Sequence, residues 1–577
     1  MPPTHEVINQ PPPLADLDVF GADTALVEGV ARHGAGAAAG RLTELGRLAG
    51  SATAQQWGAA ANAVPPVLRT HDRYGHRIDE VEFVPAWHEL LRVAVQYGLH
   101  GTPWAAAPGV APPCVVPPAA VAPGAAHVAR AAGFFVWSQV EAGHGCPISM
   151  TYSVLPALRT TPDLAARYGP GLTSTTYDPG LREPTGKAGL LAGMAMTEKQ
   201  GGSDVRANTT RAVPAGDGSY LLTGHKWFCS APMCDVFLVL AVADPATRGS
   251  RAAGGTRPAA APTGPGPTCF LVPRVRPDGT RNPFLLQRLK DKLGNRSNAS
   301  AEVEFDGTVG WPVGDLGRGI PTIIEMVRMT RLDCVIGSAA AMRAATTQAI
   351  HHATHRSAFG GPLRSAPLMR AVLADLALET EAATALALRL AAAVDGQETA
   401  FGRLATAVGK FWVCKRAVGV VAEALECLGG NGYVEDSGLP RLYREVPVNS
   451  IWEGSGNVIA LDVLRAIGRQ PESTAAFLAE LDAAGGADRR LDDAVRLLRH
   501  ELADAADPAV RARRVTALMA LCLQGALLVR YAPAVVADAF CASRLTPGGP
   551  PTAGSVAGLL PPGLNAAAVV DRAAPPT

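Results

Sequence analysis

The spacing of apolar residues changes twice along this chain, from helical to strand-like and back to helical. Up to about residue 190 apolar residues recur at helical spacing, as in AWHELLRVAVQYGLH and ARAAGFFVWSQVEAG. Between about 191 and 312 they alternate in short runs bounded by turn residues, as in GSYLLTGHKWFCS and DVFLVLAVA. Long amphipathic segments return from about 318 to 468. The order therefore predicts a multi-domain α+β chain in which a small β domain separates two helical parts.

The same pattern predicts the domain organisation. Long amphipathic segments indicate an antiparallel helical bundle, and the short alternating segments indicate a small antiparallel barrel or sandwich. A Pro/Gly/Ala-rich C-terminal stretch is typical of a disordered tail, and low complexity within the β region is typical of a disordered loop. The predicted parts are an N-terminal helical domain (1–190), a middle β domain (191–312, with the loop at 243–267), a C-terminal helical bundle (313–470), an extra helical module (471–545) and a disordered tail (546–577).

Charge, cysteine content and hydropathy exclude several classes of protein. The formal net charge of +1 predicts no general attraction to nucleic acid or anionic membranes. The ten cysteines are scattered without a C-x-x-C pair, which indicates reduced, cytoplasmic thiols rather than a disulfide frame or a zinc site. The N-terminal residues lack the pattern of a signal peptide. The apolar run at 515–529 is too short to cross a bilayer, so we predict a buried core helix and no membrane association.

Two features that resemble known motifs, a dinucleotide-binding turn and a pair of zinc ligands, are rejected because the neighbouring residues do not fit those motifs. GAGAAA (34–39) resembles a dinucleotide-binding turn but follows a helical segment, where that fold needs a strand. His351 and His355 lie four residues apart, as zinc ligands do, but no carboxylate lies between them, and an ordinary helix face is the simpler reading. We therefore predict no metal site.

The stretch IWEGSGN (451–457) sets a single carboxylate, Glu453, between a tryptophan and a glycine-rich turn that precedes an apolar, helix-like run. The positive end of a helix dipole favours an acid at this position without any catalysis. Ile451 and Trp452 would also form a dry pocket in which a carboxylate could act as a base. These residues alone leave both readings open.

A second stretch, AMTEKQGGSDVRANTT (195–210), gathers hydroxyls and flexible backbone where the helical pattern gives way to strands. The pair Gly201 and Gly202 would let backbone N–H groups approach a flat or anionic ligand closely. Taken by itself, a glycine-rich turn capped by Ser203 or Asp204 explains the stretch equally simply.

Six motifs occur in a fixed order and carry a resemblance to a known family. They are AMTEKQGGSD (195–204), GHKWFCS (224–230), RLKDKLGNRSNAS (288–300), HRSAFGGPL (355–363), LGGNGYVEDSGLPRLYREV (428–446) and IWEGSGN (451–457). Together they resemble the acyl-CoA dehydrogenase family, and within it the branch of flavoproteins linked to the bacterial response to alkylation damage. The resemblance implies the acyl-CoA dehydrogenase fold, with an N-terminal helical domain, a middle antiparallel β-barrel or sandwich and a C-terminal helical bundle, here followed by an extra helical module.

The family binds FAD between the β domain and the bundle, usually in a homotetramer, so the resemblance implies FAD and a homotetramer here. Arg356 and Phe359 would then reach the FAD of a neighbouring subunit. Pro367 is a departure, because the family usually has a glutamine that contacts FAD at this place. The residues implied in FAD binding are Met196, Thr197, Gly202, Ser203, Phe228, Cys229, Ser230, Arg356, Phe359, Gly429, Gly430, Ile451, Gly454 and Ser455.

Glu453 matches the catalytic base of the family, which removes the α-proton of an acyl-CoA thioester. The resemblance implies weak α,β-dehydrogenation of a short or branched acyl-CoA, with Arg331 where family members often contact CoA. The alternative is a DNA-binding protective or detoxifying flavoprotein in which dehydrogenation is vestigial. A scaffold with a vestigial flavin is a third reading.

Members of the alkylation-response branch also bind duplex DNA, mainly through the C-terminal module. Residues 471–545 of this chain contain nine arginines and ten acidic residues, a balance that is not typical of a phosphate-binding surface. Arg511, Arg513 and Arg514 form the densest cluster of positive charge and are the candidates for contact with double-stranded DNA. A solvated, salt-bridged helix face is the other reading of such a run.

Overall fold

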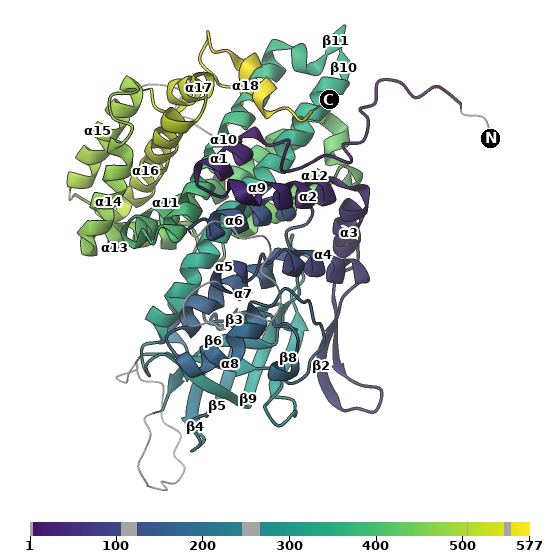
Figure 1. Cartoon of the computed structure of the whole chain (residues 1–577), viewed down its shortest axis with the longest axis vertical. Helices are drawn as coiled ribbons and strands as arrows, with labels where there is room; N and C mark the ends of the chain where they lie inside the picture. Colours follow the sequence, from purple (N-terminus) through teal and green to yellow (C-terminus); the bar gives the residue numbers. More distant parts are fainter. Residues whose placement is uncertain (1–3, 106–123, 245–265, 505, 547–555, 577) are drawn as a thin grey trace.

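The computed structural model describes residues 4–105, 124–244, 266–504, 506–546 and 556–576. A β-barrel lies at one end of the long axis, N-terminal helices lie against the barrel and a bundle of long helices, and the last helices lie beside that bundle (Figure 1). This arrangement confirms the predicted fold class. Most of the predicted loop at 243–267 lies outside the described residues.

The N-terminal part is helical except for one hairpin that the helical prediction missed. Its strands are β1 (Val67–His71), which buries no residue, and β2 (Arg77–Glu82), which buries only Asp79 and Val81, so the hairpin lacks the apolar alternation by which a strand is recognised in sequence. Asp72 holds the turn by accepting from the N–H groups of Tyr74 and His76. The helices are α1 (Thr24–Arg32), α2 (Ala39–Gly50), α3 (Ala52–Ala63), α4 (Pro85–Gln96), α5 (Thr102–Ala105), α6 (Ala126–Ser138), α7 (Gly145–Leu158) and α8 (Pro162–Leu172).

The described residues of the middle domain form seven strands, and five of them close into a ring in the order β6–β4–β5–β9–β7 and back to β6. The pairs β3–β6 and β4–β6 are parallel, whereas a wholly antiparallel barrel was expected. Residues of β6 are buried almost throughout because the barrel core lies on one side and helices cover the other. The strands are β3 (Ala192–Ala195), β4 (Arg211–Pro214), β5 (Tyr220–Ser230), β6 (Val236–Ala243), β7 (Thr268–Pro273), β8 (Phe284–Leu289) and β9 (Ser300–Val313).

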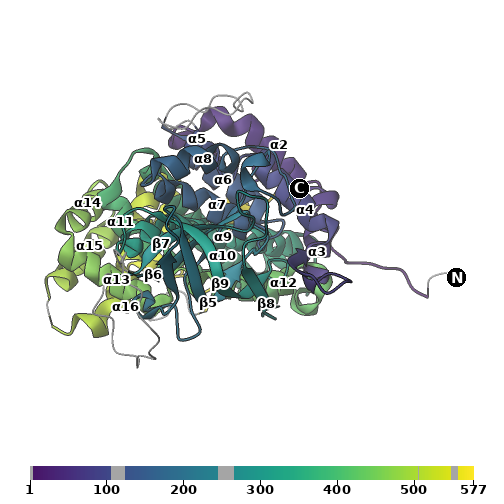
Figure 2. The ribbon, with the colours of Figure 1, turned by 90° about the horizontal axis from the view of Figure 1, so that it is seen from below.

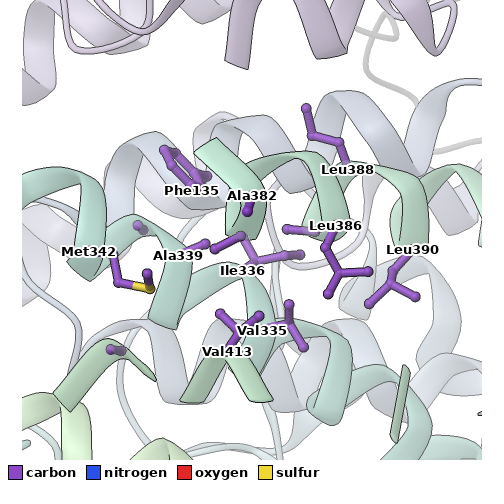
Figure 3. Packing of buried hydrophobic residues seen from close by; sticks show 14 of the residues in the cluster. Phe135, Val335, Ile336, Ala339, Met342, Ala382, Leu386, Leu388, Leu390 and Val413 are labelled. Atoms are coloured by element: carbon purple, nitrogen blue, oxygen red, sulfur yellow. The ribbon is translucent and has the colours of Figure 1, made fainter. Parts of the chain in front are cut away.

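Three long helices form the core of the bundle: α9 (Gly319–His355), α10 (Pro367–Asp395) and α11 (Thr399–Cys427). Figure 3 shows their apolar faces meeting, with Ile336 of α9 beside Ala382 and Leu386 of α10 and Val413 of α11 nearby. A short hairpin of β10 (Ser357–Ala358) and β11 (Gly361–Pro362) joins α9 to α10, and Pro367 takes the first position of α10. The bundle is completed by α12 (Leu439–Glu445) and α13 (Gly456–Arg469).

The extra module lies beside the bundle on the side away from α2 to α4, as Figures 1 and 2 both show. Its helices are α14 (Pro471–Asp482), α15 (Arg489–Ala503), α16 (Pro508–Tyr531) and α17 (Ala534–Arg544). Among the described residues only α16 is long and apolar enough to span a membrane, and 67% of its most apolar window is buried inside the protein. The prediction of a buried core helix at 515–529 is confirmed.

The prediction of a disordered tail over 546–577 is wrong for residues 556–576. They include α18 (Ala566–Ala573), an amphipathic helix whose Val569 and Val570 are buried in the main core. Arg572 reaches Glu28 of α1 at 2.6 Å and Glu381 of α10 at 2.9 Å. The Pro/Gly/Ala-rich composition concealed a helix that is ordered by these long-range contacts.

Replacing Arg572 by alanine should lower the free energy of unfolding by about 1–2 kcal/mol, because two carboxylates lose a charge-assisted partner. Urea unfolding followed by circular dichroism measures the change. Arg47→Ala is the matched control, since Arg47 is exposed and forms no ion pair within the described part of the chain. Equal stability of the two variants would show that Arg572 does not stabilise the packing of α18 against α1 and α10.

Candidate active site

The turn that carries Glu453 is held by groups from two other helices. Glu453 has a φ of 56°, a left-handed conformation that a non-glycine residue rarely adopts. Lys410 of α11, 1% exposed, donates to the carbonyls of Trp452, at 2.8 Å, and Gly454. Arg331 of α9 donates through Nε to the Glu453 carbonyl at 2.9 Å. Three consecutive carbonyls are therefore fixed, which holds the unusual backbone in place.

The Glu453 carboxyl is bound by Thr330, whose hydroxyl donates to Oε2 at 2.7 Å. Burial raises the pKa of Glu453 above its ordinary value, while the Thr330 hydrogen bond and the charges of Arg331 and Lys410 act in the opposite direction. A desolvated carboxylate with a raised pKa is the arrangement that a general base requires.

The loop after β3 is anchored by a buried ion pair. Lys226 of β5 and Glu198 of the loop are both 0% exposed, and the Lys226 Nζ lies 2.8 Å from the Glu198 Oε1. Burial opposes the charge of Glu198, but Lys226 and the Thr209 and Thr210 donors outweigh it and hold the pKa of Glu198 at about 2. Trp227 also donates its backbone N–H to the Thr197 carbonyl at 2.8 Å. The two motifs that contain these residues are thus parts of one structure.

Cys146, at the start of α7, links the end of β5 with Glu453. Ser230, Asn298 and Lys292 are near enough to this thiol to lower its pKa, and the charge of Glu453 raises it. Burial raises the pKa of this thiol to about 11, so it is neutral at physiological pH. Lys292 donates to the Asn298 carbonyl and, at 3.0 Å, to the Ser300 hydroxyl. The end of β5, the loop before β9, the start of α7 and the Glu453 turn therefore surround one region.

The residues predicted to bind FAD on β3, β5 and the Glu453 turn fit such a group. Phe228 is 50% and Ile451 64% exposed, so two apolar side chains are open to contact a flat ring. A Cβ at Gly202 would lie 2.4 Å from the Thr197 hydroxyl oxygen, so that only glycine lets the backbone pass this close. Met196, Ser203, Ser230, Gly454 and Ser455 supply backbone and hydroxyl groups around them. Cys229 is 0% exposed and points into the barrel core, so its side chain is not open to a ligand.

Four other predicted FAD residues lie elsewhere. Arg356 follows α9 and Phe359 lies at the tip of the β10–β11 hairpin, at the opposite end of the long axis from the barrel (Figure 1). Along α9, Arg356 is roughly 37 Å from Arg331 at 1.5 Å per residue. Gly429 and Gly430 begin the 3₁₀ turn after α11. Within one chain these four residues do not join the Glu453 region.

Arg511, Arg513 and Arg514 do not form one patch. Arg511 is 15% exposed at its side chain and is bound to Glu501 and Asp504 at 2.8 and 2.9 Å. Arg514 is exposed and also bound to Glu501, at 2.8 Å. Arg513 points to the Glu453 turn, where it donates to the Asn457 side chain at 2.8 Å. The predicted cluster is therefore divided in two, because Arg511 and Arg514 share Glu501 whereas Arg513 faces the start of α13, and DNA contact by these residues stays a prediction.

Sequence reasoning missed Thr330, Lys410 and Cys146. Each lies within a helix whose apolar pattern explains the segment without a site. One signal was available for Lys410, because lysine is rare in this arginine-rich chain and Lys410 falls inside an apolar helical run.

Comparisons with known proteins agree with this architecture. Three family profiles match in order: the Adaptive response protein AidB N-terminal domain over residues 9–179, the Acyl-CoA dehydrogenase middle domain over 193–308 and the Acyl-CoA dehydrogenase C-terminal domain over 317–468. AidB of Escherichia coli (strain K12), provisionally assigned as an acyl-CoA dehydrogenase, is 45% identical over 543 residues, which cover 93% of this chain and 94% of that protein. Acyl-CoA dehydrogenase family member 11 of Caenorhabditis elegans is 31% identical over 506 residues, covering 82% of this chain and 77% of that protein.

Two solved structures resemble the chain over most of its length. Caenorhabditis elegans ACDH-11 in complex with C11-CoA has a TM-score of 0.79 at 26% sequence identity and covers 94% of both chains. The structure named Bd2924 apo-form has a TM-score of 0.78 at 27% identity, covering 91% of this chain and 99% of that one. An acyl-CoA dehydrogenase complexed with FAD from Bacillus anthracis, at 17% identity and a TM-score of 0.57, shares the fold.

Glu198→Gln should lower the free energy of unfolding by about 3 kcal/mol, because Lys226 is left buried without a charged partner. The double variant Glu198→Gln, Lys226→Met should recover most of that loss, since no buried charge remains and glutamine still accepts from Thr209 and Thr210. Urea unfolding of both variants and the parent measures the two changes. A single variant as stable as the parent would show that the buried pair does not anchor the loop.

Proposed function

Because the chain belongs to the acyl-CoA dehydrogenase family and is an oxidoreductase of that type, we propose that it dehydrogenates a short or branched acyl-CoA with Glu453 as the base. Glu453 takes the α-proton of the thioester. FAD, when bound, supplies the two-electron oxidant for the same reaction.

This proposal rests on the hydrogen bonding and the burial of the Glu453 carboxyl. Thr330 binds Oε2, and no hydrogen bond to Oε1 is formed within the described residues. One oxygen is therefore positioned while the other is open to accept a proton. Burial strengthens a carboxylate as a base, and the bonds to Lys410 and Arg331 keep it from turning away.

We propose that FAD lies between β5 and the Glu453 turn. Phe228 and Ile451 would contact the ring, and Thr197, Ser203 and Ser230 would offer hydroxyl groups. This proposal is supported by the exposure of both apolar side chains and by the loop after β3, where Gly202 lets the backbone pass close to Thr197. Arg356, Phe359, Gly429 and Gly430 would serve the FAD of a second copy in a homotetramer, since α9 places Arg356 far from its own Glu453 turn.

The proposal of a short or branched acyl group rests on the resemblance of the six sequence motifs to the family. The structure of the relative from Caenorhabditis elegans contains C11-CoA, so the two proteins would differ in the length of the acyl chain that they accept.

A cytoplasmic location is supported by the free state of all nine described cysteines. A role in the alkylation response is supported by the match of residues 9–179 to the AidB N-terminal domain.

Glu453→Gln should slow α-proton exchange of a short acyl-CoA in D₂O by about 10²–10⁴-fold, because glutamine cannot accept the proton. Mass spectrometry of the recovered thioester measures exchange, with butyryl-CoA and undecanoyl-CoA as the short and long probes. Unchanged exchange would remove Glu453 as the base, and faster exchange with the long probe would overturn the proposed substrate.

The exchange rate should rise with pH and level off above the pKa of Glu453, since only the ionised carboxyl accepts a proton. That pKa is raised by burial, so the rise should lie above the ordinary range of a glutamate. Burial favours the protonated form on folding, and that contribution is lost as pH rises through the raised pKa. Glu453→Gln should therefore be at least as stable as the parent at pH 8, which separates lost chemistry from lost folding.

The second candidate function is protective association with duplex DNA through the C-terminal module. The observation that favours it is the exposure of Arg489, Arg496 and Arg514, which are 95%, 72% and 65% exposed at their side chains. Replacing all three by alanine should weaken binding of a duplex and flatten its dependence on salt, because each phosphate contact releases counterions. An unchanged salt slope would reject these arginines as the DNA contact.

A further inference from the structure

The beginning of the chain contacts the end of α9, which lies far from it in sequence. Residues 4–13, which we call the N-terminal segment, lie toward the same end of the long axis as the β10–β11 hairpin (Figure 1). The Asn9 side chain donates to the Ser357 carbonyl at 2.8 Å and accepts from the Ser357 N–H at 2.8 Å. One amide side chain therefore pairs with both backbone groups of the first residue of β10, as a neighbouring strand would.

Two carbonyl groups of the N-terminal segment accept hydrogen bonds from side chains at the end of α9. The Asn9 carbonyl accepts from the Arg356 Nη1, and the Pro12 carbonyl accepts from the His351 Nε2 at 2.9 Å. With the two bonds to Ser357, four hydrogen bonds join the N-terminal segment to the end of α9 and the start of β10.

The residues of the N-terminal segment favour this bound conformation. Asn9 has a φ of 57°, in the left-handed region that asparagine tolerates better than most residues. Residues 11–13 are all proline, which restricts φ and leaves no backbone N–H without a partner. Just beyond the segment, the Asp16 N–H donates to the Gly50 carbonyl of α2 at 2.8 Å. The segment is therefore stiff and is attached at both ends.

Arg356 is oriented by this contact but is not neutralised by it. Within the described residues its guanidinium forms no ion pair, and its side chain donates only to the Asn9 carbonyl. A neutral carbonyl fixes the direction of the guanidinium and leaves its positive charge and its other N–H groups available to an anion. Loss of the Asn9 contact would leave this side chain without a fixed partner.

We propose that Asn9 is a positioning residue, which holds Arg356 ready for the FAD of a second copy of this chain. The Asn9 side chain binds Ser357 and thereby fixes its own carbonyl beside the guanidinium. An arginine that is already held in place loses less side-chain freedom when it binds an anion. The inference rests on the proposed function, in which Arg356 serves the FAD of a second copy.

The test uses the purified holoprotein and the variants Asn9→Ala, Arg356→Ala and their double variant. Gln10→Ala is the matched control, because Gln10 is exposed and its side chain forms no hydrogen bond within the described part of the chain. Release of FAD after dilution is followed by flavin fluorescence, and thermal unfolding establishes that each variant is folded. Hydrogen–deuterium exchange, read by mass spectrometry in the peptide that contains Ser357, reports the contact itself.

Asn9→Ala should speed FAD release by about threefold to tenfold, because Arg356 must then be ordered when FAD binds. Arg356→Ala should speed it further, since the charge itself is lost. The double variant should release FAD no faster than Arg356→Ala, because Asn9 acts through Arg356. The peptide containing Ser357 should exchange faster in Asn9→Ala, with and without FAD, and the control should change neither measurement.

Four results would overturn the inference. They are unchanged FAD release in Asn9→Ala while Arg356→Ala speeds it, an equal change in Gln10→Ala, additive effects in the double variant, or unchanged exchange of the Ser357 peptide. A parent protein that carries no FAD, or unchanged FAD release in Arg356→Ala, would instead overturn the proposed function. The two failures are therefore distinguishable.

Discussion

The buried ammonium group of Lys410 fixes the turn on which the active site depends. It bonds carbonyls on both sides of Glu453, whose φ of 56° would otherwise relax. Such a conformation costs about 1–3 kcal/mol and persists only where the surroundings enforce it. The strained backbone directs the carboxyl to Thr330 and exposes the first turn of α13 on its other side. The position of the Glu453 carboxyl is thus a consequence of backbone geometry that other helices enforce.

Lysine marks special positions in this arginine-rich chain. Arginine could have filled most surface sites, but a planar guanidinium does not replace a compact ammonium inside a cage of carbonyls or a tight ion pair. Five of the chain's seven lysines are paired or enclosed in this way. They are Lys187, Lys226, Lys290, Lys292 and Lys410.

The fold class and the Glu453 turn could be predicted because the change of periodicity and the motifs are local patterns. Thr330 and Cys146 could not, because their roles arise only when distant helices meet. Arg513 and Arg514 are neighbours in sequence, yet successive residues of a helix point in directions about 100° apart, so they face different surroundings. Helix α18 was missed because its apolar face is short, and its order comes from partners near the other end of the chain.

The contact between Arg572 and Glu28 spans 544 residues of sequence. A ribosome adds roughly 5–20 residues per second, so about half a minute to two minutes separate the synthesis of these two partners. During that time α1 lacks the helix that ties it to α10. Unfinished chains therefore display apolar surface that finished chains conceal, and chaperones or proteases that recognise such surface could tell the two apart without reading the active site at all.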